Sequence, residues 1–194
     1  MTETAHRAVT NPDGRRQRAD DNRRRIALAM LELVREGEMA PSAEAVAERA
    51  GVGRRTVFRL FNDMEGVYRE MHAVMTARIA PTFVAPFAGA TWRERVEEII
   101  ERRARMFEEM LPIKSAADAL RSHSNFLQSE HRKITQLQRK TLVAVLPAHV
   151  EAEKIEALDL ALSFEAWRRL RDEQRLPIKH AIATQRLLVW AVLG

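Results

Sequence analysis

The sequence predicts an all-α protein, with an N-terminal three-helix helix-turn-helix domain followed by a longer helical domain. Three observations favour helices. Aromatic residues make up only 6% of the chain, so residues typical of strands are scarce. Glycine and proline contribute only seven residues each among 194, so turn-forming residues are also few. Several segments, finally, carry apolar residues at intervals of three and four, which is the spacing of one helix face.

The composition excludes several classes of protein. Without cysteine, the chain has no disulfide, no thiolate zinc site and no cysteine nucleophile. The longest apolar run, Leu187 to Leu193, has seven residues, whereas a helix needs ~20 to cross a bilayer. The polar start, Met1 to Asp21, lacks the apolar stretch of a secretion signal. We therefore expect a cytoplasmic protein with no membrane association, no metal and no cofactor.

The N-terminal part is expected to contain a flexible arm (residues 1–14) and a helix-turn-helix domain (residues 15–62). The arm lacks periodicity and ends in Asn-Pro-Asp-Gly. Three short helices should follow, separated by Gly37 and by the turn Gly51-Val52-Gly53: Asn22 to Glu36, Ala43 to Ala50 with Ser42 as N-cap, and Arg54 to Leu60. Two short helices around a glycine turn are typical of a helix-turn-helix.

The basic charge is concentrated in this part of the chain. Residues 15–59 hold 11 arginines and no lysine, against seven acidic residues. The planar fork of arginine matches phosphates and guanine edges. The third helix should present its arginines outward, with no acidic residue between Gly51 and Phe61. This pattern favours binding in the DNA major groove. The alternative is a compact helical subdomain with an arginine-rich exposed face.

Residues 63–194 should form longer helices. Asn62 and Asp63 cap the first, and Thr91 with Glu94 forms a capping box that opens the second. We expect these helices: Met64 to Ile79, ended by Pro81; Trp92 to Met110, broken by Pro112; Ser115 to Ser124; Asn125 to Leu146; His149 to Gln174; and a final helix from Pro177.

The last two expected helices are apolar on more than one face. Leu158 and Leu162 mark one stripe, whereas Leu160, Phe164 and Trp167 mark another. Such helices must be buried on several sides. We expect a homodimer through these helices, with two from each subunit forming a four-helix bundle. The alternative is burial within one subunit.

Several segments together resemble one family of proteins. The segment GVGRRTVFRLFNDMEGVY (residues 51–68) resembles the DNA-binding signature of TetR-family transcriptional regulators. The helix Arg25 to Glu36 and the stretch AEAVAERAGV (residues 43–52) support it. FEAWRRLRDEQRLP (residues 164–177), followed by an apolar helix, looks like the dimerisation end of that family.

The resemblance implies a homodimeric regulator, and in particular a repressor that a small-molecule effector releases from a pseudo-palindromic double-stranded DNA operator. The two reading helices would lie one DNA turn, ~34–36 Å, apart, and the helix from Asp63 to Ile79 would link the two domains. Thr56 matches the family's threonine, and Phe61 a buried position. Seven residues are our candidate DNA contacts: Arg54, Arg55, Thr56, Phe58, Arg59, Ser42 and Arg25.

Four positions depart from the family pattern: Gly53, Phe58, Leu60 and Met64 stand where polar or basic residues are common. The departures remove groups that cap the helix or contact the DNA backbone. We therefore expect weaker sequence-independent affinity and a shallower dependence on salt. The three arginines of the third helix, together with Arg15, Arg16 and Arg18 in a basic leader that reaches the minor groove, are expected to supply the missing charge.

The effector pocket is expected among the helices between residues 64 and 170. Three polar residues, Arg103, His123 and Glu130, fall on otherwise apolar stripes, and such groups need a partner, whether protein, water or ligand. The candidate lining residues are Trp92, Arg103, Met106, Phe107, Met110, His123, Phe126 and Trp167. The alternative is that these side chains form ordinary core.

Two other functions remain open from sequence: a helix-turn-helix activator or protein-responsive regulator, and a helical-bundle enzyme. A di-iron bundle needs Glu-x-x-His pairs on facing helices, and the only such motif is Glu3 to His6 in the arm. No glycine-rich phosphate loop and no nucleophile motif is present. We therefore expect a protein that is not an enzyme.

Overall fold

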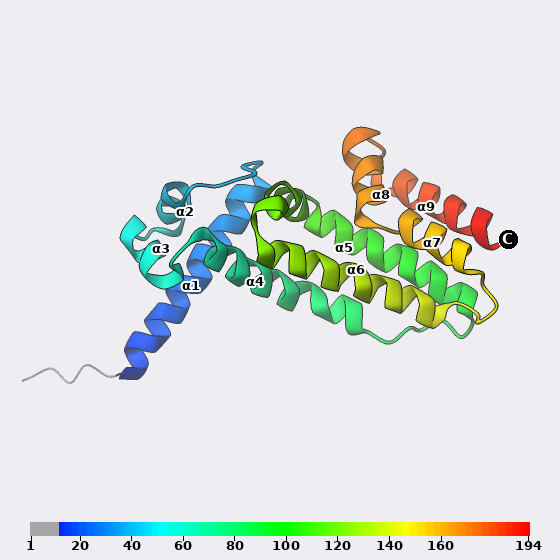
Figure 1. Ribbon diagram of the computed structural model, residues 1–194, viewed down its shortest axis with the longest axis horizontal. Coiled ribbons are helices and arrows are strands. Elements are labelled where there is room, and N and C mark those ends of the chain that lie inside the picture. Colours follow the sequence, from blue (N-terminus) through cyan, green and yellow to red (C-terminus); the bar gives the residue numbers. More distant parts are fainter. Residues whose placement is uncertain (1–11) are drawn as a thin grey trace, which may run out of the picture. The chain divides into compact units, whose positions relative to one another are not determined.

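The computed structural model describes residues 12–194, and every regular element among them is a helix (Figure 1). The predicted all-α class is therefore confirmed for the described residues. The expected arm lies outside them as far as residue 11, whereas Pro12 to Gly14 already belong to the first helix. The chain divides into two compact units, which meet in the sequence between Met75 and Thr76.

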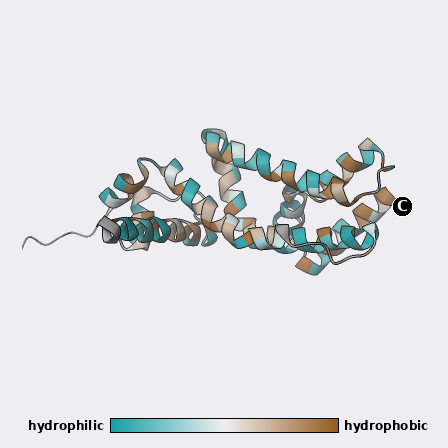
Figure 2. Ribbon diagram, turned by 90° about the horizontal axis from the view of Figure 1, so that it is seen from below, coloured by the Kyte–Doolittle hydropathy of each residue, from teal (hydrophilic) through white to brown (hydrophobic). Residues whose placement is uncertain are grey.

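The N-terminal unit contains α1 (Pro12–Arg35), α2 (Ala43–Ala50), α3 (Arg54–Phe61) and the first part of α4 (Met64–Val84). Its core joins all four helices through fully buried apolar side chains, among them Ile26, Met30, Val46, Val57 and Val67. Helix α1 begins at Pro12 and not near Asn22. Proline is favoured in a first helical turn, which explains the earlier start. Figure 2 shows α1 changing from hydrophilic at its start to hydrophobic toward its end.

The turn between α2 and α3 has the geometry that the sequence predicts. Gly51 adopts the left-handed conformation, with φ 62° and ψ 39°, and its N–H bonds to the carbonyls of Ala47 and Glu48. Glycine reaches this region without a steric cost. Gly66 in α4 is needed for a different reason, because a Cβ there would lie 2.6 Å from the carbonyl oxygen of Phe61.

The C-terminal unit continues from α4 into a helical bundle. Its elements are α5 (Trp92–Leu120), η1 (Arg121–His123), α6 (Asn125–Val145), α7 (Ala152–Ala161), α8 (Phe164–Arg168), the π-turn η2 (Arg169–Glu173) and α9 (Ile178–Leu193). The core draws on four helices, including Ile100 of α5, Leu142 of α6, Leu158 of α7 and Val189 of α9. No helix among the described residues is long and apolar enough to cross a membrane.

Two expected helix ends at proline are wrong. Pro81 lies inside α4, near its last turn, and Pro112 lies inside α5, which continues to Leu120. The segment from Ser115 is therefore not a separate helix. An interior proline costs about 3 kcal/mol. Helix α5 tolerates it because Met110 and Ile113, on either side of Pro112, are both buried against neighbouring helices.

The expected single helix from His149 to Gln174 is also wrong, because the chain breaks at Leu162 and Ser163. The hydroxyl of Ser163 accepts a hydrogen bond from the N–H of Ala166 and so caps α8. The break turns Phe164 and Trp167 into the core of the C-terminal unit. There the Phe164 ring lies edge-on to the Phe107 ring, with 5.6 Å between the ring centroids. These two side chains are therefore buried without a second copy, whereas Leu160 of α7 remains 70% exposed.

Candidate nucleic-acid interface and candidate ligand cavity

Helix α3 carries a basic exposed face. Val57 and Phe61 point into the core, so the opposite side of the helix presents Arg54, Arg55, Phe58 and Arg59. Thr56 is half-buried beside them. The structure thus places five of the predicted contacts on one short helix.

Arg54 is not as free as the sequence suggested. Its guanidinium pairs with Glu44 of α2 at 2.8 Å and lies over the Phe58 ring, 5.4 Å from the centroid. Glu44 belongs to the preceding helix, so the spacing of residues within α3 does not reveal this pair. Both side chains are more than half exposed, at 63% and 56%, so the pair contributes little stability. A phosphate can therefore replace the carboxylate at little cost.

Two further predicted contacts have structural roles. The hydroxyl of Ser42 accepts from the N–H of Ala45 at 3.1 Å and caps α2. Arg25 donates from Nη2 to the carbonyl of Ala50 at 2.6 Å, which ties α1 to the end of α2 beside Gly51. Arg25 therefore helps to fix the turn that positions α3.

The basic leader is helical and not an arm. Arg15, Arg16 and Arg18 all belong to α1, and Nε of Arg18 donates to the carbonyl of Gly14 at 2.8 Å. Arg18 and Asn22 of α1 and Arg59 and Leu60 of α3 line an open hollow of about 480 Å³. The helical leader therefore extends the basic face of α3 along α1.

The C-terminal unit contains a small cavity of about 30 Å³, which has space for about one or two water molecules. Its walls come from α4, α5, α6 and the segment between α4 and α5. The lining residues are Thr82, Phe87, Ile99, Arg102, Arg103, Met106, Gln138 and Thr141.

Only two of the predicted pocket residues, Arg103 and Met106, line this cavity. The others are placed elsewhere: Phe107, Met110 and Trp167 are core residues, Trp92 packs beside Trp190, Phe126 is half-buried, and His123 is exposed in η1. Ile99 could have been found from its helical spacing to Arg103 and Met106. Gln138 and Thr141 carry no comparable signal, because their place beside Arg103 depends on how α6 packs against α5.

Arg103 is almost completely buried, with 5% of its surface exposed. Its Nη1 donates to the carbonyl of Leu162 at 2.9 Å, and its Nη2 to the carbonyl of Gln138 at 2.6 Å. Burial lowers the pKa of the guanidinium to about 10, although the charge of Asp159 opposes this shift. The side chain therefore keeps its positive charge at neutral pH.

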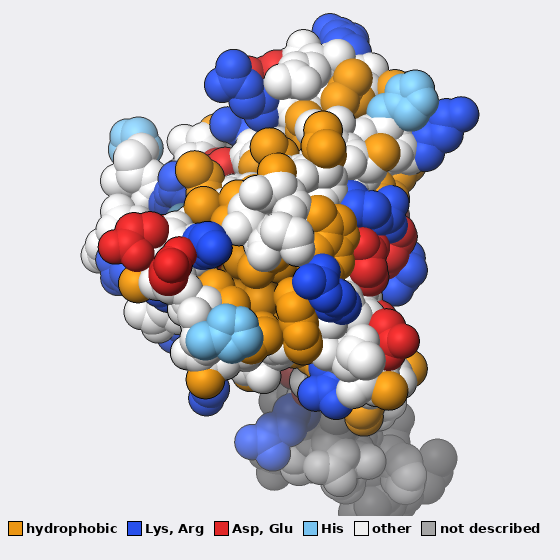
Figure 3. Space-filling view, turned by 90° about the vertical axis from the view of Figure 1, so that its right-hand side faces the viewer, with side chains coloured by type: hydrophobic (Ala, Val, Ile, Leu, Met, Phe, Trp, Pro, Cys, Tyr) orange, Lys and Arg blue, Asp and Glu red, His pale blue; other side chains and the backbone are white. Residues whose placement is uncertain are grey.

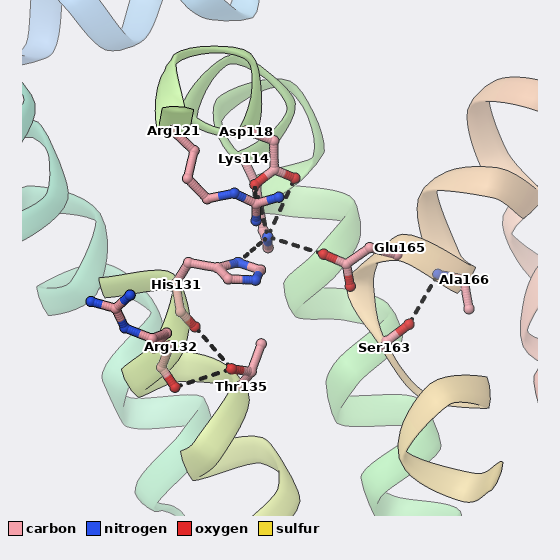
Figure 4. A network of polar contacts seen from close by, with 9 residues as sticks. All are labelled: Lys114, Asp118, Arg121, His131, Arg132, Thr135, Ser163, Glu165 and Ala166. Carbon is pink, nitrogen blue, oxygen red and sulfur yellow. Dashed lines mark hydrogen bonds and ion pairs between the residues drawn. The ribbon is translucent and has the colours of Figure 1, made fainter. Parts of the chain in front are cut away.

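Lys114, also buried, forms the centre of a second polar cluster (Figure 4). Its ammonium pairs with Asp118 at 3.3 Å and Glu165 at 3.6 Å, and it lies 3.4 Å from Nδ1 of His131. Burial, together with the charges of Lys114 and Arg121, lowers the pKa of His131. The cluster joins α5, α6 and α8, and its charges are internally balanced.

Comparison with solved structures identifies the fold. The chain is similar to a crystal structure from Rhodococcus sp. that is described as a TetR-family transcriptional regulator, with a TM-score of 0.68 over 92% of this chain and 100% of that one. The sequence identity is 13%, so the likeness is one of fold. No protein-family model and no curated protein matches the sequence. The chain therefore has the fold of a TetR-type regulator.

Proposed function

We propose that this protein is a sequence-specific DNA-binding transcriptional regulator. The observation that carries the proposal is the basic face of α3, which is held outward by the Gly51 turn. Arg55 and Arg59 lie one helical turn apart on it and are both exposed. Arginine is the residue type best suited to reading guanine in the major groove. The TetR-like fold supports the same function.

We further propose that it acts as a homodimer through α7 and α9. Large apolar side chains of these helices remain exposed in the single subunit: Leu160 at 70%, Ile178 at 44%, Leu187 at 71% and Leu188 at 45%. Figure 3 looks onto the right-hand side of Figure 1, where α9 lies, and shows hydrophobic side chains gathered in the middle of that face. A twofold dimer would place two reading helices on a pseudo-palindromic operator.

In this proposal the protein is a repressor, and a small molecule bound in the cavity of the C-terminal unit releases the operator. Helix α4 provides a continuous connection, because it contributes Val67 to the core of the N-terminal unit and Thr82 to the cavity. The cavity is far smaller than the ~300–1,000 Å³ typical of sites for drug-sized ligands. Binding would therefore have to displace side chains that line it, and such a displacement would act on α4.

The test begins with selection of duplexes from a random library, followed by fluorescence anisotropy on the selected sequence. Replacing both Arg55 and Arg59 by alanine should weaken binding by at least tenfold, because bidentate base contacts are worth about 1–3 kcal/mol each. The matched control replaces Arg132 and Arg169, two exposed arginines of the C-terminal unit, by alanine. It removes the same amount of positive charge as the first variant. Equal losses in the two variants, or no selected duplex, would contradict the proposal.

A further inference from the structure

The cavity of the C-terminal unit has an unusual balance of charge. Two guanidinium groups, Arg102 and Arg103, are among its lining residues, and none of those residues is acidic. Arg102 is already engaged, because it pairs with Glu98 at 3.0 Å and donates to the carbonyl of Pro86 at 2.6 Å. Arg103 therefore makes the wall of the cavity positive.

The charge of Arg103 has no carboxylate partner at ion-pair distance among the described residues. Its two hydrogen bonds go to backbone carbonyls, which carry partial charge only. Asp159 acts on it from a longer range and lies 4.0 Å from Arg139. A buried cation is costly unless an anion neutralises it. The lining of the cavity does not supply the negative group that would neutralise Arg103.

Gln138 provides a second, independent observation. Its side chain is 5% exposed and lines the cavity, and its amide makes no hydrogen bond to any described residue. Buried polar groups nearly always have a partner, which can be protein, water or ligand. The amide NH₂ is a donor, as are the remaining N–H groups of Arg103. Both groups therefore suit an acceptor-rich anion.

We propose that the effector of this protein is a small organic acid. Its carboxylate binds Arg103 and Gln138, and its apolar part occupies the space between Ile99, Met106 and Phe87. This inference rests on the proposed regulatory function. Phe87 lies in the segment between α4 and α5, beneath the guanidinium of Arg102 at 4.7 Å from the ring centroid. A ligand larger than one or two waters must displace Phe87 or Met106.

The experiment compares carboxylates with matched neutral molecules. Thermal melting is recorded with acetate, butyrate, hexanoate, octanoate and benzoate, with the corresponding alcohols, and with inorganic phosphate at equal ionic strength. A ligand that binds only the folded state raises the midpoint. We expect a rise with at least one carboxylate and none with its alcohol or with phosphate. No rise with any carboxylate, or an equal rise with the alcohol, overturns the inference.

A variant separates binding from structural stability. Gln138→Leu keeps the approximate volume of the side chain but removes the hydrogen-bond donor. We therefore expect calorimetry to show that the Kd of the active carboxylate rises by about tenfold to a hundredfold. Gln136→Leu, on the exposed side of the same helix, should leave the Kd unchanged. Unchanged binding in Gln138→Leu overturns the inference, and this variant avoids the loss of folding expected when Arg103 itself is removed.

Failure of the effector class can be distinguished from failure of the proposed function. If the protein binds a selected duplex but no carboxylate, the ligand class is wrong and the regulatory function stands. If it binds no duplex, the regulatory function is wrong whatever the acids do. If the protein binds both a selected duplex and a carboxylate, the carboxylate should lower the affinity of the wild-type protein for the duplex. At the same carboxylate concentration, Gln138→Leu should remain bound to the duplex.

Discussion

At the scale of single residues, the two buried cations of the C-terminal unit differ in how their charges are balanced. Lys114 has Asp118 and Glu165 as partners and also lies over the Phe164 ring at 4.5 Å. Arg103 donates only to backbone carbonyls. The charges of the Lys114 cluster therefore balance one another, whereas Arg103 has no carboxylate at ion-pair distance among the described residues.

His131 should make stability depend on pH. Folding lowers its pKa below the ordinary 6.5, so the folded state favours the neutral ring. The unfolded chain then binds the proton more readily, and stability falls as the pH drops below 6.5 until it reaches the folded-state pKa. Urea unfolding between pH 7.5 and 5 should show that the free energy of unfolding falls less in His131→Gln than in wild type. The exposed His149→Gln serves as control, and identical profiles in wild type and His131→Gln would refute this role.

Met64, the first residue of α4, stands where the resemblance leads us to expect lysine. A lysine at this helix start would add one phosphate contact in each subunit. Met64→Lys should therefore tighten duplex binding and steepen the dependence of log K on log salt by about 0.9 for each contact. Anisotropy titrations at several salt concentrations measure both effects. Equal or weaker binding would show that the start of α4 does not face the DNA backbone.

At the scale of elements, the spacing of α3 and α4 depends on a missing side chain. A Cβ at Gly66 would approach the Phe61 carbonyl oxygen to 2.6 Å, and that oxygen belongs to backbone that cannot easily move. Gly66→Ala should therefore destabilise the N-terminal unit by about 1–3 kcal/mol in denaturant unfolding. Gly14→Ala in α1 is the control, because its nearest atom would be 4.0 Å away. Similar stability in the two variants would mean that α4 shifts freely.

The sequence predicted the elements whose ends have local causes. Both ends of α2 follow from Ser42 and Gly51, and α3 begins where expected. Pro112 misled the prediction because tertiary burial around it outweighs a local cost. The break at Ser163 did carry a signal, a serine cap with Glu165 in the following turn, that the apolar spacing of the region obscured.

The two candidate sites also differ in how far the sequence alone could predict them. The exposed face of α3 follows from helical spacing within eight residues, so it could be predicted. The cavity joins residues from three helices and a connecting segment, and no spacing rule brings Thr82, Arg103 and Gln138 together. Arg103 was found because a charged residue on an apolar stripe is conspicuous, whereas Gln138 required the fold.

At the scale of the whole molecule, the proposed homodimer is the property that would set the geometry of an operator. Leu187 is 71% exposed in the single subunit. Leu187→Glu should place a charge in the proposed interface and convert the dimer into a monomer in light scattering coupled to gel filtration. Leu137→Glu, at a 50% exposed leucine of α6, should remain dimeric. A monomeric wild type at micromolar concentration, or a dimeric Leu187→Glu, would contradict the proposed interface.

The most direct test of the central claim is the ratio of Kd values for a scrambled duplex and a selected operator, measured with Arg55 and Arg59 both replaced by lysine. Lysine keeps the charge but loses the planar fork that reads base edges. We predict that affinity for the scrambled duplex stays within about twofold, whereas the ratio falls by at least tenfold. An unchanged ratio would mean that α3 does not read the DNA sequence.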